Sequence, residues 1–468
     1  METLQRTANR GSVSTGYDID NSLKIEADNA ERIFRASSDI GTPTSTQKAT
    51  ISYWIKRTEL QSSGNSIVFI ANAGGVNTFN GFNNDRLKHI SDVSNAGNFT
   101  SNAVFRDTTA WYHVVWALDT TQGTDTNRVK AYVNGVQITS WSTATYPNQN
   151  NVIGLYETNM GHYFGWSDAQ SQSGYYAEAY LIDGQQLAPP EFGECDSDTG
   201  IWIPKAYTGS FGNEGYHLDF EDSSNLGLDV SGNSNNFGSL YSVSAADQAT
   251  DTPTNNFCTF NPLMTQNNPP TISEGATKST GGGGTWNQTW GNMGVKNGKW
   301  YYEFKVTNTS SSGYFGASTT PAEGSSTTAN TLMYNTSFML GSPGRIDYYY
   351  WQNGSQVSNE STGWGTISTN DIIGIALDLD SSTKKFIVYK NGSALNGSGT
   401  DLPTNMQDEF IFPLYVQYEN RADEANFGGY TISSISSAAS DGNGHGTFEI
   451  APPSGYLAIC TKNIAETG

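Results

Sequence analysis

Two segments of this chain, far apart in the sequence, are nearly identical in pattern. Residues 116–119 read WALD and lead through a polar loop to VKAYVNG at 129–135, while residues 375–378 read IALD and lead to FIVYKNG at 386–392. Each copy is an apolar strand, a loop and a second strand that ends in Asn-Gly, the dipeptide best suited to the two positive φ angles of a type I′ hairpin turn. The repeat predicts two antiparallel β-sandwiches in tandem.

Length and composition agree with an all-β fold of two domains. The chain has 468 residues, and all-β domains often reach ~200–250 residues, so each half can form a core. Aromatic residues make up 12% of the chain and suit pleated, half-buried surfaces. Alternating apolar runs between turn residues predict strands at 49–57, 66–71, 109–118, 128–133 and 175–182, and again at 299–307, 313–317, 346–351, 371–377, 385–389 and 410–418.

A polar stretch separates the two predicted domains. Residues 242–256 read SVSAADQATDTPTNN and contain almost no large apolar side chain. We therefore predict a first domain at 1–243, with a polar N-terminal arm up to about residue 45, a jelly roll and a return strand at 216–220. The second domain is predicted at 244–468.

Charge and cysteine content restrict the partners and the compartment. The formal net charge is -21, from 45 Asp and Glu against 24 Lys and Arg, so the chain lacks the basic surface that a phosphate backbone requires. We expect no nucleic-acid partner and no membrane insertion, since the apolar runs are short. The three cysteines have no metal-ligand spacing, and no signal peptide is visible at the N-terminus, so we expect synthesis in a reducing cytoplasm.

Both halves resemble known families. The motifs TISYWIKR, TTAWYHVVWALD, NRVKAYVNG and GYYAEAYLIDG, within residues 45–185, resemble a laminin-G-like jelly roll of the concanavalin type. The motifs KNGKWYYEFKV, DIIGIALDLD, KFIVYKNG and FPLYVQYENRADEANFG, within residues 285–430, resemble a SPRY domain. Laminin-G-like domains often hold calcium between loops, and Asp119 and Asp125 lie near such a loop without a full ligand set. SPRY domains bind partners through variable loops.

The run that connects the two domains carries a third resemblance. Stretches within residues 179–263 and the terminal APPSGYLAICTKNI are similar to marine bacteriophage structural proteins that join these same two domain types. The resemblance implies a protein of the virion surface, in a tail fibre or another appendage that binds host glycan, or else a capsid decoration protein. Expected partners are other virion proteins and further copies of this chain. A polysaccharide depolymerase or glycosidase and a cellular SPRY adaptor are the alternatives from other classes.

Aromatic side chains of the second half are the candidate glycan-binding residues. Ring faces stack on sugars, and aromatic residues bury a large area at low entropy cost. In the run DYYYW at 347–351, alternate rings face opposite sides of one strand, and further tryptophans lie in predicted Gly/Ser/Asn-rich loops. Packing in the core is the competing explanation for each ring. The candidates are Trp286, Trp290, Tyr349, Trp351 and Trp364.

No carboxylate pattern in the sequence favours catalysis. Glycosidases of concanavalin-type folds use paired carboxylates on one strand, but the usual E-x-D-x-(x)-E pattern is absent. The nearest candidates are Asp219 with Glu221, which would share a strand face, and the cluster Glu191, Glu194 and Asp196. Both are expected to be ordinary acidic surface groups.

Turn capping explains the remaining oxygen-rich motifs. Asp378 and Asp380 precede a loop, and the alternating oxygens from Asp229 to Asn235 lack the glycine and the glutamate of a calcium loop. The histidines form no grouping with Ser and Asp. We therefore predict a non-enzymatic protein without a catalytic residue or a required cofactor, with calcium as the one weak possibility.

Overall fold

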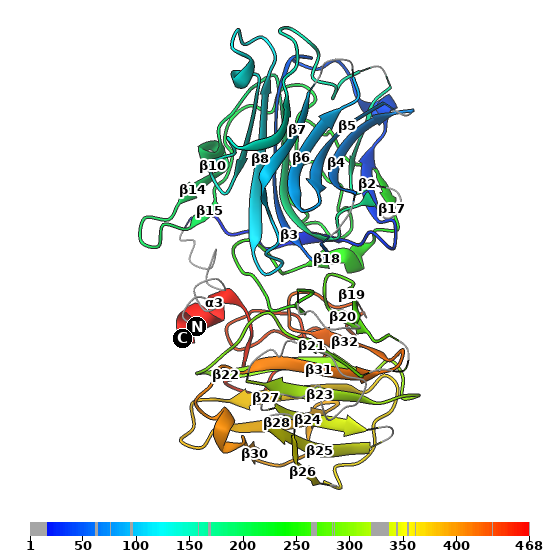
Figure 1. Cartoon of the computed structure of the whole chain (residues 1–468), viewed down its shortest axis with the longest axis vertical. Coiled ribbons are helices and arrows are strands. Elements are labelled where there is room, and N and C mark those ends of the chain that lie inside the picture. Colours follow the sequence, from blue (N-terminus) through cyan, green and yellow to red (C-terminus); the bar gives the residue numbers. More distant parts are fainter. Residues whose placement is uncertain are drawn as a thin grey trace. The chain divides into compact units, whose positions relative to one another are not determined.

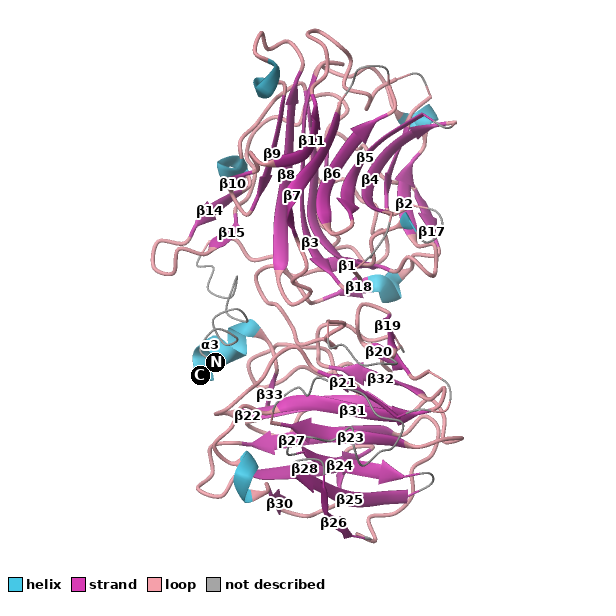
Figure 2. Ribbon diagram, viewed as in Figure 1, coloured by secondary structure: helices cyan, strands magenta, loops and turns pink. Residues whose placement is uncertain are grey.

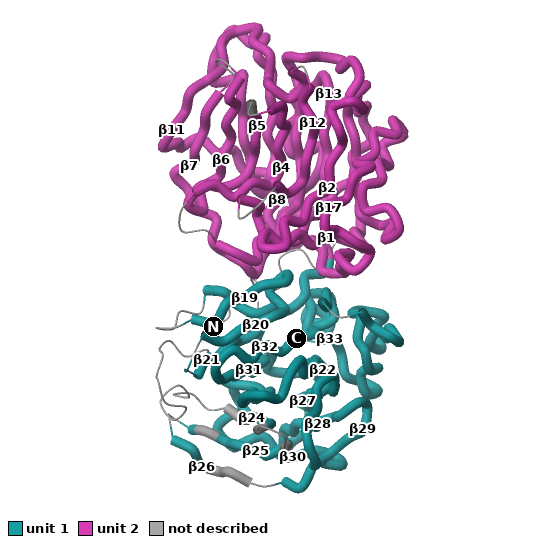
Figure 3. Tube along the Cα trace, turned by 90° about the vertical axis from the view of Figure 1, so that its right-hand side faces the viewer, with its two compact units in different colours: residues 1–12, 255–468 teal, residues 13–254 magenta. Residues whose placement is uncertain are grey.

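The structure, a computed structural model, confirms the predicted fold class. Within the described residues, the chain is 43% strand, and its one α-helix is α3 (Thr461–Thr467). The chain divides into a first unit, Val13–Thr254, drawn in magenta as unit 2 in Figure 3, and a second unit that contains Asn255–Gly468, drawn in teal as unit 1. The described residues are 16–60, 64–74, 76–93, 97–157, 159–166, 170–263, 269–282, 284, 286–319, 337–342, 345–352, 355–360, 362–432 and 434–467.

The first unit is a sandwich of two large antiparallel sheets (Figures 1 and 2). One sheet has the order β10-β9-β8-β3-β13-β1-β18, with β16 also paired to β13. Its strands are β10 (Val136–Gln137), β9 (Val129–Val133), β8 (Trp111–Asp119), β3 (Lys48–Arg57), β13 (Gly174–Asp183), β1 (Ser22–Ile25), β18 (Gln248–Ala249) and β16 (Tyr216–Leu218). The other sheet has the order β11-β7-β6-β5-β4-β12-β2-β17.

The second sheet of this unit consists of β11 (Trp141–Thr145), β7 (Asn98–Val104), β6 (Arg86–Ser91), β5 (Val76–Asn83), β4 (Asn65–Ala73), β12 (Gly161–Phe164), β2 (Arg32–Arg35) and β17 (Ser239–Tyr241). Apolar side chains at every second position, such as Val129, Ala131 and Val133 of β9, face the layer between the sheets and form its core. A small hairpin of β14 (Gly193–Cys195) and β15 (Trp202–Pro204) stands apart from both sheets.

The first unit extends beyond the boundary predicted after residue 243. Strand β18 pairs with β1, and Asp251 forms a buried ion pair with Lys56 of β3. The polar region expected to be an arm also supplies β1 and β2 to the two sheets. The compact unit therefore runs to Thr254, because these last residues belong to its sheet and its buried ion pairs.

The second unit is also built from two large sheets (Figure 1). The first has the order β19-β20-β32-β22-β27-β28-β29, with β30 paired to β28 and β33 parallel to β22. Its strands are β19 (Thr271–Ser273), β20 (Lys278–Thr280), β32 (Ala422–Asn426), β22 (Lys299–Lys305), β27 (Ile372–Asp378), β28 (Lys385–Lys390), β29 (Ser393–Ala394), β30 (Thr400–Asp401) and β33 (Leu457–Ala458).

The other sheet has the order β21-β31-β23-β24-β25-β26. Its strands are β21 (Trp286–Trp290), β31 (Phe412–Tyr418), β23 (Gly313–Ser318), β24 (Ser337–Ser342), β25 (Arg345–Gln352) and β26 (Ser355–Glu360). Trp300, Tyr302 and Phe304 of β22 pack against Phe315 and Tyr415 of this sheet in one buried cluster. The core of the second unit thus lies between the two sheets.

Both predicted Asn-Gly hairpin turns are confirmed. Asn134 and Gly135 have φ angles of 48° and 76°, and Asn391 and Gly392 have 49° and 82°. Positive φ at both central positions defines the type I′ turn. The repeated motif therefore forms the same structure in each unit.

Candidate functional site

One face of the sheet β21–β26 carries a row of half-buried aromatic rings. Trp286 stacks on Tyr314, with ring centroids 5.4 Å apart, and its ring lies 5.0 Å from that of Tyr418. Tyr314 in turn meets Tyr349 edge to face at 5.3 Å. We call Trp286, Tyr314, Tyr349 and Tyr418 the aromatic row.

Strand register brings these four residues to the same face. Trp286 lies opposite Tyr418, and Tyr314 lies opposite Val416 on the next strand. Val416 and Tyr418 share a face, because residues two apart on a strand point the same way. On the same face, these rings pack against a small apolar cluster that is separate from the main core: Trp290, Phe412, Leu414 and Val416.

The structure places the five predicted aromatic residues differently. Trp286 and Tyr349 belong to the aromatic row, whereas Trp290 is only 2% exposed within the adjoining apolar cluster. Trp286 and Trp290 were expected in a loop, but both lie on β21, which pairs with β31 along its whole length. Trp364 packs against the main core of the unit, and the side chain of Trp351 lies outside the described part of the chain.

The aromatic row offers apolar ring faces together with neutral hydroxyl groups. Burial raises the pKa of the Tyr314 phenol, and the neighbouring Tyr349 and Asp347 raise it further. The phenol therefore stays protonated and keeps its ability to donate a hydrogen bond. Rings with a polar edge suit ligands that have both an apolar face and hydroxyl groups.

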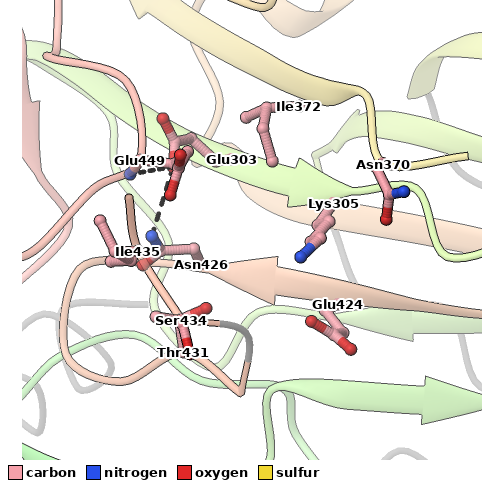
Figure 4. A pocket seen from close by; sticks show the side chains of 10 residues that line it. All are labelled: Glu303, Lys305, Asn370, Ile372, Glu424, Asn426, Thr431, Ser434, Ile435 and Glu449. Atoms are coloured by element: carbon pink, nitrogen blue, oxygen red, sulfur yellow. Dashed lines mark hydrogen bonds between the residues drawn. The ribbon is translucent and has the colours of Figure 1, made fainter. Parts of the chain in front are cut away.

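A polar pocket opens on the other sheet of the same unit (Figure 4). Its volume is about 140 Å³, and it lies over β22, β27 and β32. Alternation on β22 turns Glu303 and Lys305 away from the core, where Asn426 and Glu424 lie opposite them on β32. The pocket is lined by Glu303, Lys305, Asn370, Ile372, Glu424, Asn426, Thr431, Ser434, Ile435 and Glu449.

Glu303 is the buried centre of this pocket and is fully engaged by the protein. Its Oε1 accepts from the Tyr301 hydroxyl at 3.0 Å and from the backbone N–H of Ile450 at 2.9 Å. Its Oε2 accepts from the N–H of Glu449 at 3.0 Å and from Asn426 Nδ2 at 3.3 Å. Burial outweighs these donors and raises the pKa of Glu303 to about 7.

A buried Ser-His pair in the first unit is arranged for structure rather than nucleophilic chemistry. His113 Nε2 lies 2.8 Å from the Ser52 hydroxyl, and Trp202 Nε1 donates to His113 Nδ1 at 3.0 Å. An indole N–H can only donate, so Nδ1 carries the lone pair and Nε2–H faces Ser52. His113 in this tautomer cannot accept the hydroxyl proton of Ser52 as a general base.

A second group of titratable residues surrounds Glu178 on β13. Glu178 Oε2 accepts from the Tyr17 hydroxyl and from His217 Nε2, each at 2.9 Å, and also from the Tyr180 hydroxyl. Its φ angle is +50°, at an irregularity in the pairing of β13 with β3. These donors hold the carboxylate in place and attach the segment around Tyr17 to the sheet.

The predicted carboxylate pair Asp219 and Glu221 does not lie on a strand. β16 ends at Leu218, earlier than predicted, and Phe220 between the two residues has a φ angle of +61°. Burial raises the pKa of Asp219, and its Oδ1 accepts the backbone N–H of Glu221. The regular alternation that would have placed both carboxylates on one face is therefore absent here.

The other predicted acidic residues cap turns or are exposed. Asp119 accepts from Thr121 and Gln122, while Asp125 Oδ1 accepts the backbone N–H of Thr126. Asp378 accepts from the backbone of Asp380 and Ser381. Glu191, Glu194 and Asp196 are exposed or half-buried around the β14–β15 hairpin, and Asp229 accepts the N–H groups of His217, Ser231 and Asn235.

In the described part of the chain, no three His, Cys, Asp or Glu side chains are grouped so that they could hold a metal ion. None of the helices in that part is long and apolar enough to cross a membrane.

Comparison with known proteins bears on the first unit. Residues 34–174 match the model of a laminin-G family described as the concanavalin A-like lectin/glucanases superfamily. The first unit contains a lectin-type domain of the concanavalin kind. No curated protein matches the chain significantly.

Solved structures give weak likenesses to both expected domain types. The SPRY domain of human HERC1 is 16% identical and covers 36% of this chain and 96% of its own, with a TM-score of 0.27. Domains LG4-5 of the mouse laminin alpha1 chain are 9% identical and cover 94% of this chain and 97% of their own, with a TM-score of 0.28. A SAP-like pentraxin from Limulus polyphemus is 15% identical and covers 37% of this chain and 80% of its own, with a TM-score of 0.27. Scores this low carry no functional argument.

Proposed function

We propose that this chain is a non-enzymatic protein of the outer surface of a bacteriophage particle, where it binds glycan of the host surface as part of a tail fibre or another appendage. The aromatic row is the observation that carries the proposal. Trp286, Tyr314 and Tyr349 lie side by side in space, and each ring is in contact with the next. All three rings are only half-buried, on a face turned away from the main core.

The physical basis is stacking of sugar rings on aromatic faces. Aromatic pairs contribute about 0.5–1.5 kcal/mol beyond the area that they bury, and a similar gain for each sugar ring corresponds to a several-fold change in affinity. Several rings in a row suit a chain of sugars better than one small ligand. The lectin-type domain of the first unit supports carbohydrate as the ligand class.

The virion location rests on sequence. The connecting run and the C-terminal motif are similar to bacteriophage structural proteins that join these two domain types. The proposed partners are therefore other virion proteins, further copies of the chain and the host glycan. Binding of this kind requires no cofactor.

Incubation of purified protein with host polysaccharide tests binding and catalysis together. We expect the polysaccharide to be retained by immobilised protein and to keep its number of reducing ends. New reducing ends would identify a depolymerase and overturn the non-enzymatic proposal. Failure to retain any surface polysaccharide of a susceptible host would overturn glycan binding.

A capsid decoration protein is the second candidate. Its support is the tightly packed C-terminus: the backbone N–H of Asn256 donates to Thr461 Oγ1, and Asn463 Nδ2 of α3 donates to Asp441. Such packing suits a compact clamp on a capsid lattice. Electron microscopy of particles carrying labelled protein distinguishes the two, because density on the head contradicts the appendage and density on the tail contradicts the decoration role.

A further inference from the structure

The polar pocket of the second unit is held open by hydrogen bonds in its own walls. Glu303 fixes the backbone of Glu449 and Ile450 against β22. The Glu449 carboxylate in turn accepts from the backbone N–H and the hydroxyl of Ser436. These bonds fix the segments beside the cavity and occupy the Glu303 and Glu449 carboxylates of its lining.

Four polar side chains of the lining remain available for a ligand. Among the described residues, no hydrogen bond or ion pair engages the Lys305 ammonium or the side chains of Asn370, Thr431 and Ser434. Lys305 lies opposite Glu424 in the register of β22 and β32, and Figure 4 shows both side chains at one side of the cavity. The four available groups thus comprise the Lys305 ammonium, which only donates, and three side chains that can both donate and accept.

Size and charge narrow the class of ligand. A cavity needs roughly 10–15 Å³ for each water that it holds, so about 140 Å³ matches a ligand of about ten heavy atoms. Three carboxylates, Glu303, Glu424 and Glu449, line the pocket against the one ammonium of Lys305. This balance disfavours an anion, and Lys305 disfavours a cation.

We propose that the polar pocket binds one neutral hexose unit, with the side chains of Lys305, Asn370, Thr431 and Ser434 hydrogen-bonding its hydroxyl groups. This inference rests on the proposed carbohydrate-binding function, but it uses a different surface. The pocket and the aromatic row lie on opposite outer faces of the unit, because each sheet turns its other face to the core between them.

Titration of the full chain with methyl glycosides of glucose, galactose and mannose tests the proposal, with ligand-observed NMR as the readout. We expect at least one of them to bind wild-type protein, and the Lys305→Met and Asn370→Ala variants to bind it at least about fivefold more weakly. Lys385→Met is the matched control, since Lys385 lies on the same sheet outside the pocket. It should bind like wild type.

Other outcomes overturn the proposal. Equal hexoside binding by Lys305→Met, Asn370→Ala and wild type would place the sugar elsewhere. Tighter binding of glucuronate or of glucosamine than of every neutral hexoside would refute the charge argument. If no neutral hexoside binds while polysaccharide is still retained through the aromatic row, the pocket proposal fails and the proposed function stands.

Discussion

Asn134 and Asn391 make the same pair of hydrogen bonds at corresponding corners of the two sandwiches. Asn134 Oδ1 accepts the backbone N–H of His113 at 2.7 Å, and Asn391 Oδ1 accepts that of Ile372 at 2.8 Å. Their own N–H groups donate back to the carbonyl oxygens of His113 and Ile372, at 2.8 and 2.9 Å. Each Asn-Gly turn is therefore tied to the strand that precedes its hairpin.

Replacing either asparagine by alanine should destabilise its unit. Asn134→Ala and Asn391→Ala each lose a side-chain hydrogen bond, worth about 0.5–1.5 kcal/mol. Alanine also lacks the short polar side chain that favours Asn in the left-handed region, where an ordinary residue costs roughly 1–2 kcal/mol. We expect urea unfolding to show a loss of about 1–3 kcal/mol. The corresponding glycine variants tolerate the φ angle and should lose less. Alanine variants as stable as wild type would contradict this.

The first unit should lose stability in mild acid. Burial lowers the pKa of His89 and His113 to about 3 and that of His162 to about 4. In the unfolded chain these histidines take up a proton near pH 6.5, whereas in the native chain they stay neutral down to much lower pH. Their contribution to stability is therefore fully present above about pH 6.5 and decreases as the pH falls toward 4. We expect a loss of up to about 2 kcal/mol per histidine at pH 5. Urea unfolding at pH 7 and pH 5, followed by proteolysis of peptides from the first unit, measures this loss of stability. Equal stability at the two pH values would contradict the prediction.

Glu303 should give the second unit the opposite response to pH. Its carboxyl, with a pKa of about 7, takes up a proton at higher pH in the native chain than in the unfolded one. The stabilisation that protonated Glu303 gives the second unit is fully present below the unfolded pKa of about 4.3 and is lost as the pH rises through 7. Proteolysis of second-unit peptides in urea should show unfolding at lower urea at pH 8 than at pH 6. Glu303→Gln cannot titrate and should remove that difference; an unchanged difference would refute the assignment.

Asp251 should be essential to the stability of the first unit. Its Oδ2 lies 2.6 Å from Lys56 Nζ, with the two side chains 1% and 0% exposed. Asp251→Ala leaves a buried ammonium without its counter-charge, which typically costs about 3–5 kcal/mol. Asp401→Ala removes an exposed ion pair with Lys385 and should cost less than about 1 kcal/mol. Equal effects of the two substitutions on thermal unfolding would contradict the structure.

Sequence patterns predicted the fold class because strands such as β8 and β22 are apolar and end in clear turn signals. They did not reveal β5 or β7, whose sequences VNTFNGFN and NFTSNAV are rich in Asn, Ser and Thr. In these strands only a few rings, such as Phe82 and Phe99, supply the core. The sequence also did not reveal where the first unit ends, because the ion pair between Lys56 and Asp251 depends on tertiary structure.

The candidate site was also predicted only in part, because some of its contacts depend on tertiary structure. Alternation along DYYYW correctly separates Tyr349 from Tyr348 and Tyr350, which pack against the core. Tyr314 lies between Gly313 and Phe315 on β23, and only strand register shows that it bridges Trp286 and Tyr349. Glu303 lies within a recognised motif, but its partners at Glu449 and Ile450 are distant in sequence.

Binding of host polysaccharide by aromatic variants tests the account most directly. Trp286→Ala and Tyr349→Ala remove half-buried rings of the aromatic row, whereas Tyr350→Ala removes the next ring on the same strand, which faces the core. With folding checked by circular dichroism, we predict several-fold weaker binding for the first two variants. Tyr350→Ala should bind like wild type. Unchanged binding by both Trp286→Ala and Tyr349→Ala would contradict the claim that the aromatic row recognises glycan.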